Sequence, residues 1–245
     1  MLAFEKAAEL PIDGLEMDIH ATKDGVLVVS HDDSLERMTN GEGKIQDHTL
    51  DELRQLDAGY RFSTDGGKTF PFRGQGLTIP TMEEVLKRFS ALWINVDIKA
   101  HEKEAAEKFC ALISKFNAHE RLCVGSFSTK TVKYFRDLCP QVVTIATIVE
   151  IATLLILSKL RLEKLFQGGH PIQAPPQEKR WGITLDVVTS RFLDAAHKRK
   201  TAVHLWTINE KSEMKRFVEN GVDGIITDHP DRALELLGRL PEEKS

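Results

Sequence analysis

Strand-like and helix-like segments alternate along almost the whole chain, and this order constrains the fold more than any other feature. After a first helical segment at residues 1–10, short runs rich in β-branched residues alternate with longer segments whose apolar residues recur at helical spacing. Alternation of this kind within one unit is typical of an α/β fold with a parallel sheet. The predicted parallel strands are residues 14–20, 92–98, 122–126, 142–148, 182–187, 201–208 and 224–227.

The predicted helices are marked by residues that commonly begin or end helices. Thr49 and Thr81 each precede acidic residues and suit an N-cap. Gly221 suits a C-cap, and Pro230 suits a first helical turn. The helices after the first one are expected at residues 49–56, 81–89, 102–116, 129–138, 150–166, 190–199, 210–220 and 230–240.

One pair of strand-like segments departs from this alternation. Residues 26–30 follow the strand at 14–20 after only Ala-Thr-Lys-Asp-Gly. A parallel crossover needs about a dozen residues or more, so this link is too short for one. The Asp24–Gly25 pair favours a β-hairpin instead.

The remaining seven strands and the length of 245 residues favour a (β/α)8 TIM-type barrel over a doubly wound sheet. No G-x-G-x-x-G motif follows the strand at 14–20, as a dinucleotide-binding doubly wound fold would require. Because such a barrel has eight strands, we expect residues 1–245 to form a single barrel domain that lacks its first strand and has a hairpin after the strand at 14–20.

Charge and cysteine content narrow the partners and the compartment. Thirty-three basic and 37 acidic residues give a net charge of −4, which disfavours binding to nucleic acid. Cys110, Cys123 and Cys139 form no C-x-x-C motif, so a reducing, cytoplasmic location is expected.

No stretch of the sequence resembles a secretory signal or an integral membrane segment. The most apolar stretch, residues 142–157, falls short of the roughly 20 apolar residues that span a bilayer. We interpret it as a buried strand that leads into an amphipathic helix. Weak association of that helix with a membrane surface is the alternative.

Polar residues share one face of two predicted strands. Glu16, Asp18 and His20 alternate with apolar residues, so a β-strand places all three on one side. Two carboxylates facing a barrel interior are costly unless a divalent cation compensates them. The alternative is an ordinary strand that faces solvent.

The strand at 92–98 repeats this arrangement. Asp97 and Lys99 share a face at its carboxyl end, where barrel active sites are built. Asp97 would be a third metal ligand, and Lys99 would contact a negatively charged substrate group. The alternative is a buried ion pair without a catalytic role.

Two further residues at strand ends are candidates. His31 follows the apolar run at 26–30, and a histidine there can act as a general acid or base. Trp206 ends the strand at 201–208, where it would either pack in the core or contact the apolar part of a substrate.

Taken together, these segments resemble the glycerophosphodiester phosphodiesterase family. The matching stretches are AFEKAAEL, DGLEMDIHATKDGVLVVSHDDSLERMTNGEGKI, TLDELRQLDAG, IPTMEEVL, INVDIK, SFS, AVHLWTIN and GVDGIITDHPDRALELL. The resemblance implies a (β/α)8 barrel that hydrolyses glycerophosphodiesters to glycerol 3-phosphate and an alcohol, with calcium or magnesium as cofactor.

The resemblance also implies roles for individual residues. Glu16 and Asp18 match the metal-binding pair of the family, and Asp97 matches a third carboxylate ligand that is usually glutamate. Lys99 matches a lysine near the phosphate and is thus a catalytic and substrate-binding candidate. His31 matches one of two catalytic histidines. Trp206 matches a tryptophan at the mouth of the barrel.

One part of the family pattern has no counterpart in this sequence. The family begins with a strand ending in His-Arg-Gly and a Glu-Asn-Thr segment, which carry the second histidine and another metal ligand. We therefore expect the chain as given to be a poor enzyme and a poorly closed barrel. Alternatives to a phosphodiesterase are a catalytically impaired, non-catalytic chain and a lysophospholipase D-like enzyme, for which the run at residues 154–157 gives slight support.

Overall fold

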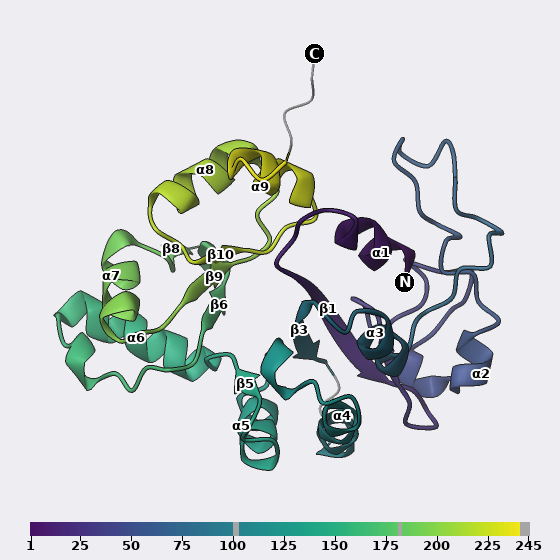
Figure 1. Ribbon diagram of the computed structural model, residues 1–245, viewed down its shortest axis with the longest axis horizontal. Helices are drawn as coiled ribbons and strands as arrows, with labels where there is room; N and C mark the ends of the chain where they lie inside the picture. The colour runs from purple at the N-terminus through teal and green to yellow at the C-terminus, as the bar shows by residue number, and fades with distance from the viewer. Residues whose placement is uncertain (100–102, 181–182, 241–245) are drawn as a thin grey trace. The chain divides into compact units, whose positions relative to one another are not determined.

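The structure is a computed structural model that describes residues 1–99, 103–180 and 183–240, with the backbone alone for residues 178–180 and 183–185. It divides into two compact units (Figure 1). The first consists of Met1–Lys6 and Asp13–Val143, and the second of Ala7–Ile12 and Thr144–Ser245. The organisation as one barrel domain stays a prediction.

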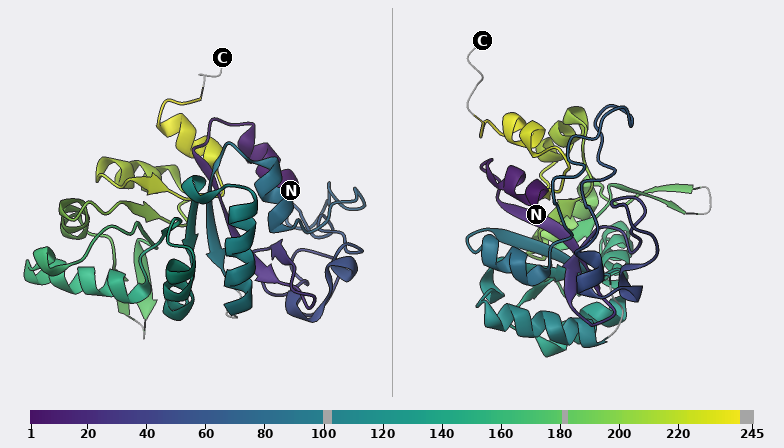
Figure 2. Two further views of the ribbon diagram at one scale, coloured as in Figure 1. Left: turned by 60° about the horizontal axis from the view of Figure 1, so that its bottom comes forward. Right: turned by 90° about the vertical axis from the view of Figure 1, so that its right-hand side faces the viewer.

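The first unit is built on a five-stranded sheet in the order β2-β1-β3-β4-β5. Strand β3 pairs in parallel with β1 on one side and with β4 on the other. Figures 1 and 2 show α4 and α5 alongside each other in this unit. The elements are α1 Leu2–Ala8, β1 Gly14–Ala21, β2 Leu27–Val29, η1 Ile45–Asp47, α2 Leu50–Leu53, α3 Met82–Arg88, β3 Trp93–Ile98, α4 Lys103–Lys115, η2 His119–Arg121, β4 Leu122–Gly125, α5 Thr129–Leu138 and β5 Val143–Thr144.

Capping residues begin the helices where the sequence predicts. The Thr49 hydroxyl accepts a hydrogen bond from the Glu52 amide, and the Glu52 side chain accepts one from the Thr49 amide. Thr81 and Glu84 form the same reciprocal pair at the start of α3. Both helices therefore begin with their first free amides satisfied.

The predicted hairpin is confirmed. Strand β2 pairs antiparallel with β1, with Ile19 opposite Val29. At its turn, the Gly25 amide donates to the Thr22 carbonyl over 2.8 Å. The φ of Gly25 is +77°, a conformation that costs glycine little and other residues more.

The second unit contains a parallel sheet in the order β10-β9-β6 and a separate antiparallel pair, β7 and β8. Its core includes the buried residues Leu154, Phe192, Val203 and Leu205. The elements are α6 Ile148–Leu160, η3 Glu163–Leu165, β6 Ile172–Ala174, β7 Gln177–Arg180, β8 Ile183–Asp186, α7 Ser190–Lys198, β9 Val203–Leu205, α8 Lys211–Glu219, β10 Gly224–Ile225 and α9 Pro230–Leu236.

The prediction of a parallel strand at residues 182–187 is wrong. Strand β8 covers most of this range and pairs antiparallel with β7, while residue 182 lies outside the described residues. The strand that joins the parallel sheet is β6, which pairs with β9. Strand β6 has only three residues and is flanked by prolines, so its sequence shows no period that would reveal it.

The helix predicted at residues 150–166 has other bounds in the structure and is not amphipathic. Helix α6 begins at Ile148 and ends at Leu160, where Arg161 adopts a left-handed conformation with φ of 60°. The helix is not amphipathic, because apolar side chains cover its outer side as well as its inner side. None of the described helices is both long enough and apolar enough to cross a membrane.

Candidate active site

The polar faces of β1 and β3 lie side by side. In the parallel register, Asp18 is opposite Asp97 and Glu16 is opposite Asn95. The alternate residues of β1, Leu15, Met17 and Ile19, are buried in the core. The period of a β-strand thus separates the two faces as the sequence predicts.

Lys99 joins the two aspartates. Its Nζ lies 2.9 Å from Asp18 Oδ1 and 2.5 Å from Asp97 Oδ2. The Lys99 amide donates to the Ile19 carbonyl over 3.1 Å, which holds the residue beside β1 just past the end of β3. Three of the predicted site residues, Asp18, Asp97 and Lys99, are therefore in direct contact.

Burial changes the acidity of this cluster. Burial raises the pKa of Asp97 above its ordinary value, against the opposing effect of its hydrogen bond to Lys99. Burial alone would lower the pKa of Lys99, but its hydrogen bonds to Asp97 and Asp18 raise it. The lysine is thereby held in its charged form between the two carboxyl groups.

Two buried polar atoms near this cluster have no hydrogen-bond partner among the residues that the structure describes. They are Asp97 Oδ1 and Nε2 of His20, the third polar residue of the β1 face. A buried polar atom left unsatisfied costs about 1–3 kcal/mol, so a bound group that contacts it is stabilising. Carboxylate oxygens are also the ligands that Ca²⁺ and Mg²⁺ prefer. Asp18 and Asp97 therefore fit a divalent cation.

The position of Glu16 supports a role as a metal ligand less directly than the positions of Asp18 and Asp97 do. Glu16 lies two residues before Asp18 on the same face of β1 and is exposed to solvent. In the part of the chain that the structure describes, no three Asp, Glu, His or Cys side chains converge closely enough to form a metal site as they stand. The role of Glu16 as a metal ligand stays a prediction.

His31 lies just beyond β2, near the same end of β1. The Ser30 amide donates to the Asp18 carbonyl over 3.1 Å, which fixes the backbone immediately before His31. The His31 side chain is 75% exposed, and its Nδ1 lies 2.7 Å from Asp32 Oδ1. When Nδ1 carries the proton for this bond, Nε2 is left available to accept another proton.

Arg37 in turn holds Asp32. Its Nη2 donates to Asp32 Oδ1 over 3.0 Å, and its Nε donates to Asp32 Oδ2. The hydrogen bond from Arg37 is the main reason that the pKa of Asp32 is lowered to about 2. Sequence reasoning missed Arg37, because it lies five residues after Asp32 on irregular backbone that has no period to read.

Sequence reasoning also missed Phe127 as a neighbour of the site. The centre of the Phe127 ring lies 4.7 Å from Lys99 Nζ, and Phe127 is 57% exposed. The preceding Ser126 hydroxyl donates to the Ile98 carbonyl over 2.7 Å, which joins the end of β4 to the end of β3. Phe127 therefore places an exposed apolar surface beside the lysine.

Trp206 belongs to the second unit, whereas Asp18, Asp97 and Lys99 belong to the first. It follows β9 directly, and its amide donates to the Ala174 carbonyl over 3.3 Å. Its role in contacting substrate stays a prediction.

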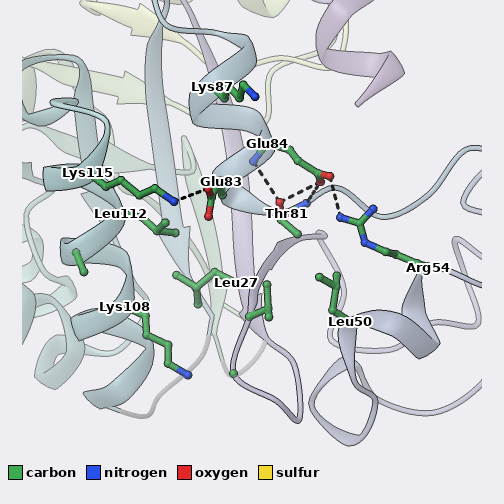
Figure 3. Close-up of a pocket in the computed structure, with 13 residues that line it drawn as sticks. Leu27, Leu50, Arg54, Thr81, Glu83, Glu84, Lys87, Lys108, Leu112 and Lys115 are labelled. Carbon is green, nitrogen blue, oxygen red and sulfur yellow. Dashed lines mark hydrogen bonds and ion pairs between the residues drawn. The ribbon is translucent and has the colours of Figure 1, made fainter.

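A groove on the first unit lies at a different place from the Asp18–Lys99–Asp97 cluster. It has a volume of about 660 Å³ and lies between the hairpin, α2, α3 and α4 (Figure 3). Its charged side chains are largely paired, with Lys115 2.6 Å from Glu83 and Arg54 2.8 Å from Glu84. None of the residues that line this groove belongs to the Asp18–Lys99–Asp97 cluster, so the groove is not the candidate active site.

Comparison with known proteins decides the family. A sequence model of the glycerophosphoryl diester phosphodiesterase family matches residues 1–232. The chain belongs to this family. Two glycerophosphodiester phosphodiesterases are among its relatives: one from Caldanaerobacter subterraneus is 30% identical and the match covers 96% of this chain and 90% of that protein, and one from Bacillus altitudinis is 32% identical and the match covers 96% and 91%.

Solved structures confirm the α/β barrel class. A glycerophosphoryl diester phosphodiesterase domain from Mycobacterium tuberculosis superposes with a TM-score of 0.83 at 18% identity, over 98% of this chain and 92% of that chain. A phosphodiesterase from Oleispira antarctica, solved with its product sn-glycerol-3-phosphate, gives 0.73 at 23% identity, over 95% and 88%. Because the chain belongs to this family, the protein is an enzyme that hydrolyses glycerophosphodiesters.

Proposed function

We propose that this phosphodiesterase releases sn-glycerol 3-phosphate and an alcohol by a reaction that depends on calcium or magnesium. The observation that carries the proposal is the contact of Lys99 with Asp18 and Asp97 at the strand ends beside His31. Carboxylates for a cation, an ammonium for a phosphate and an imidazole for proton transfer are the groups that this hydrolysis requires.

Glu16, Asp18 and Asp97 would hold the cation. A divalent cation acts as a Lewis acid on a phosphate oxygen and helps to orient the substrate. The unsatisfied Asp97 Oδ1 and the shared face of the two strands support this assignment. Asp97 has one methylene less than the glutamate usual in the family, so its carboxylate extends less far from β3.

Lys99 would bind the phosphate and stabilise charge that develops on it in the transition state. A lysine ammonium on a flexible stem can turn from one oxygen to another. A fixed positive charge in a partly buried site stabilises such a transition state more than it would in water. Phe127, whose ring lies beside Lys99, would contact the apolar part of the substrate.

His31 would transfer a proton at Nε2. Either it takes a proton from the attacking hydroxyl or water, or it gives one to the leaving alkoxide. Asp32 favours the tautomer that carries a proton on Nδ1, because the carboxylate accepts from that nitrogen. Asp32 and Arg37 are therefore positioning residues for His31.

Replacing Asp32 with asparagine is expected to lower kcat by about 10²-fold and to leave KM nearly unchanged, because the imidazole loses the bond that sets its tautomer. Long-range ¹⁵N NMR would measure the share of His31 with the proton on Nδ1, which should fall in the variant. Asp33→Asn is a matched control, since Asp33 forms an exposed ion pair with Lys44. An unchanged tautomer ratio in Asp32→Asn would contradict this role.

A second candidate function is lysophospholipase D activity. A relative from Rattus norvegicus named lysophospholipase D GDPD1 is 26% identical, with the match covering 98% of this chain and 82% of that protein. The exposed Phe127 beside Lys99 offers a surface that an acyl chain could contact. A bulkier substrate would use the same metal, lysine and histidine.

Two substrates separate these functions. Glycerophosphocholine and lysophosphatidylcholine both release choline, but only the first also yields glycerol 3-phosphate. We expect faster choline release from glycerophosphocholine with Ca²⁺ or Mg²⁺ present. Release from lysophosphatidylcholine alone would establish the second function, and release from neither would favour the non-catalytic alternative.

The proposed setting is the cytoplasm, with small phosphodiesters and no nucleic acid as ligands. The three cysteines are free thiols, which supports a reducing compartment. The net charge of −4 supports the absence of a nucleic-acid partner.

A further inference from the structure

Helix α6 exposes apolar side chains along its outer side. Figures 1 and 2 show this helix within the second unit, with α7 alongside it. Ile148, Val149, Ile156 and Leu160 are between 54% and 60% exposed, and Leu162 and Leu165 after the helix are 46% and 70% exposed. These six residues are called the α6 apolar surface. A surface helix normally has charged or polar residues on its outer side.

The inner side of α6 already packs on the core, so the α6 apolar surface is not the core face. Leu154 is fully buried, and Ile151, Leu155 and Leu157 pack against the same core. On the outer side, the hydroxyl group of Thr153 does not depend on water for a hydrogen bond. The Thr153 hydroxyl donates to the Val149 carbonyl over 2.7 Å and is thereby satisfied within the helix.

Basic residues border the α6 apolar surface at the carboxyl end of the helix. Lys159, Arg161 and Lys164 are all exposed there. The nearby acid, Glu163, lies 3.1 Å from Lys198, which offsets its charge. This end of the helix is therefore positive in a chain whose net charge is −4.

We propose that the α6 apolar surface binds an anionic lipid bilayer, with the helix lying in the plane of the membrane surface. Apolar side chains that enter the headgroup region and basic residues beside them are the features of helices that bind in this way. Lysine and arginine side chains near an anionic leaflet are attracted by its negative surface potential. This placement is independent of the catalytic proposal.

A second protein is a poorer match for this surface. A stable protein interface uses about 20–30 residues on each side, far more than the six residues of the α6 apolar surface. Two copies that packed through α6 in parallel would also bring Lys159, Arg161 and Lys164 of both chains together. A lipid surface needs no shape complementarity and supplies the opposite charge.

Flotation with vesicles tests the proposal. We expect the protein to float with vesicles of phosphatidylcholine mixed with phosphatidylserine, and less with phosphatidylcholine alone. The double variant Ile156→Gln/Leu160→Gln should reduce binding about tenfold or more. Leu237→Gln removes an apolar side chain that is 49% exposed elsewhere in the second unit and should leave binding unchanged.

A second variant tests the charges. Lys159→Gln/Lys164→Gln should remove the preference for phosphatidylserine and the sensitivity of binding to added salt. Circular dichroism would show that each variant keeps its helical content. No flotation of the unmodified protein, or equal flotation of Ile156→Gln/Leu160→Gln, would overturn the proposal. A dimer in light scattering that this double variant dissociates, without vesicle binding, would instead assign the surface to a second copy.

Discussion

Replacing His31 with asparagine is expected to lower kcat by about 10²–10⁴-fold, the usual effect of losing a general acid or base. The fold should tolerate the change, because the His31 side chain is 75% exposed and bonds to the adjacent Asp32. The melting temperature should therefore stay within about a degree or two of the unmodified protein. The measurement is choline release from glycerophosphocholine at saturating substrate.

A matched control for this variant exists in the second unit. His197 is 40% exposed and its Nε2 lies 2.9 Å from Asp223 Oδ2, so it is also an exposed histidine paired with an aspartate. His197→Asn should leave kcat unchanged. Equal kcat values for the two variants would remove His31 from the catalytic residues.

Replacing Lys99 with methionine is expected to destabilise the first unit strongly in the absence of divalent cations. The side chains of Asp18 and Asp97 are only 8% and 14% exposed, and the variant would leave them together without a positive charge. Removing one partner of a buried ion pair costs about 3–5 kcal/mol. The lower end is expected because Lys99 itself is 27% exposed.

Calcium should restore part of this stability. A cation at 100 times its Kd stabilises the folded protein by about 2.7 kcal/mol, and the two unpaired carboxylates of Lys99→Met should bind it at least as well as the unmodified site does. Even with calcium, kcat should fall by about 10²–10³-fold, because the charge that stabilises the phosphate is gone.

Lys115→Met provides the comparison. Lys115 lies 2.6 Å from Glu83 in an exposed pair, which is worth only about 0–1 kcal/mol. Urea unfolding with and without calcium would measure both variants. If Lys99→Met and Lys115→Met lose the same free energy of unfolding and respond alike to calcium, the Asp18–Lys99–Asp97 cluster is not a cation site.

Local physical rules made much of the first unit predictable. The period of two along residues 14–20 and 92–98 predicts which side chains share a face of each strand. The register that sets Asp18 opposite Asp97 is known only from the structure. The position of Thr49 before acidic residues predicts a capped helix, and the Asp24–Gly25 pair predicts the hairpin. Each rule depends on neighbours within a few residues.

Features that depend on tertiary packing could not be predicted in the same way. Strand β6 has three residues, and only its pairing with β9 identifies it. The polar segment Gln177–Arg180 became a strand by pairing with β8, which its composition does not favour. Phe127 and Arg37 reach the site from irregular segments, so no repeat in the sequence marks them.

The dependence of product release on a divalent cation tests the proposed chemistry most directly. Glycerol 3-phosphate release from glycerophosphocholine would be measured for the unmodified protein, Asp18→Asn and Asp33→Asn, after chelation and after Ca²⁺ or Mg²⁺ is added back. We expect chelation to stop release and added cation to restore it in the unmodified protein and Asp33→Asn. Asp18→Asn should be more than about 100-fold slower, since changes in groups that only orient metal ligands already cost 10–100-fold. Release that survives chelation, or equal rates for the two variants, would contradict a metal-dependent site at Asp18 and Asp97.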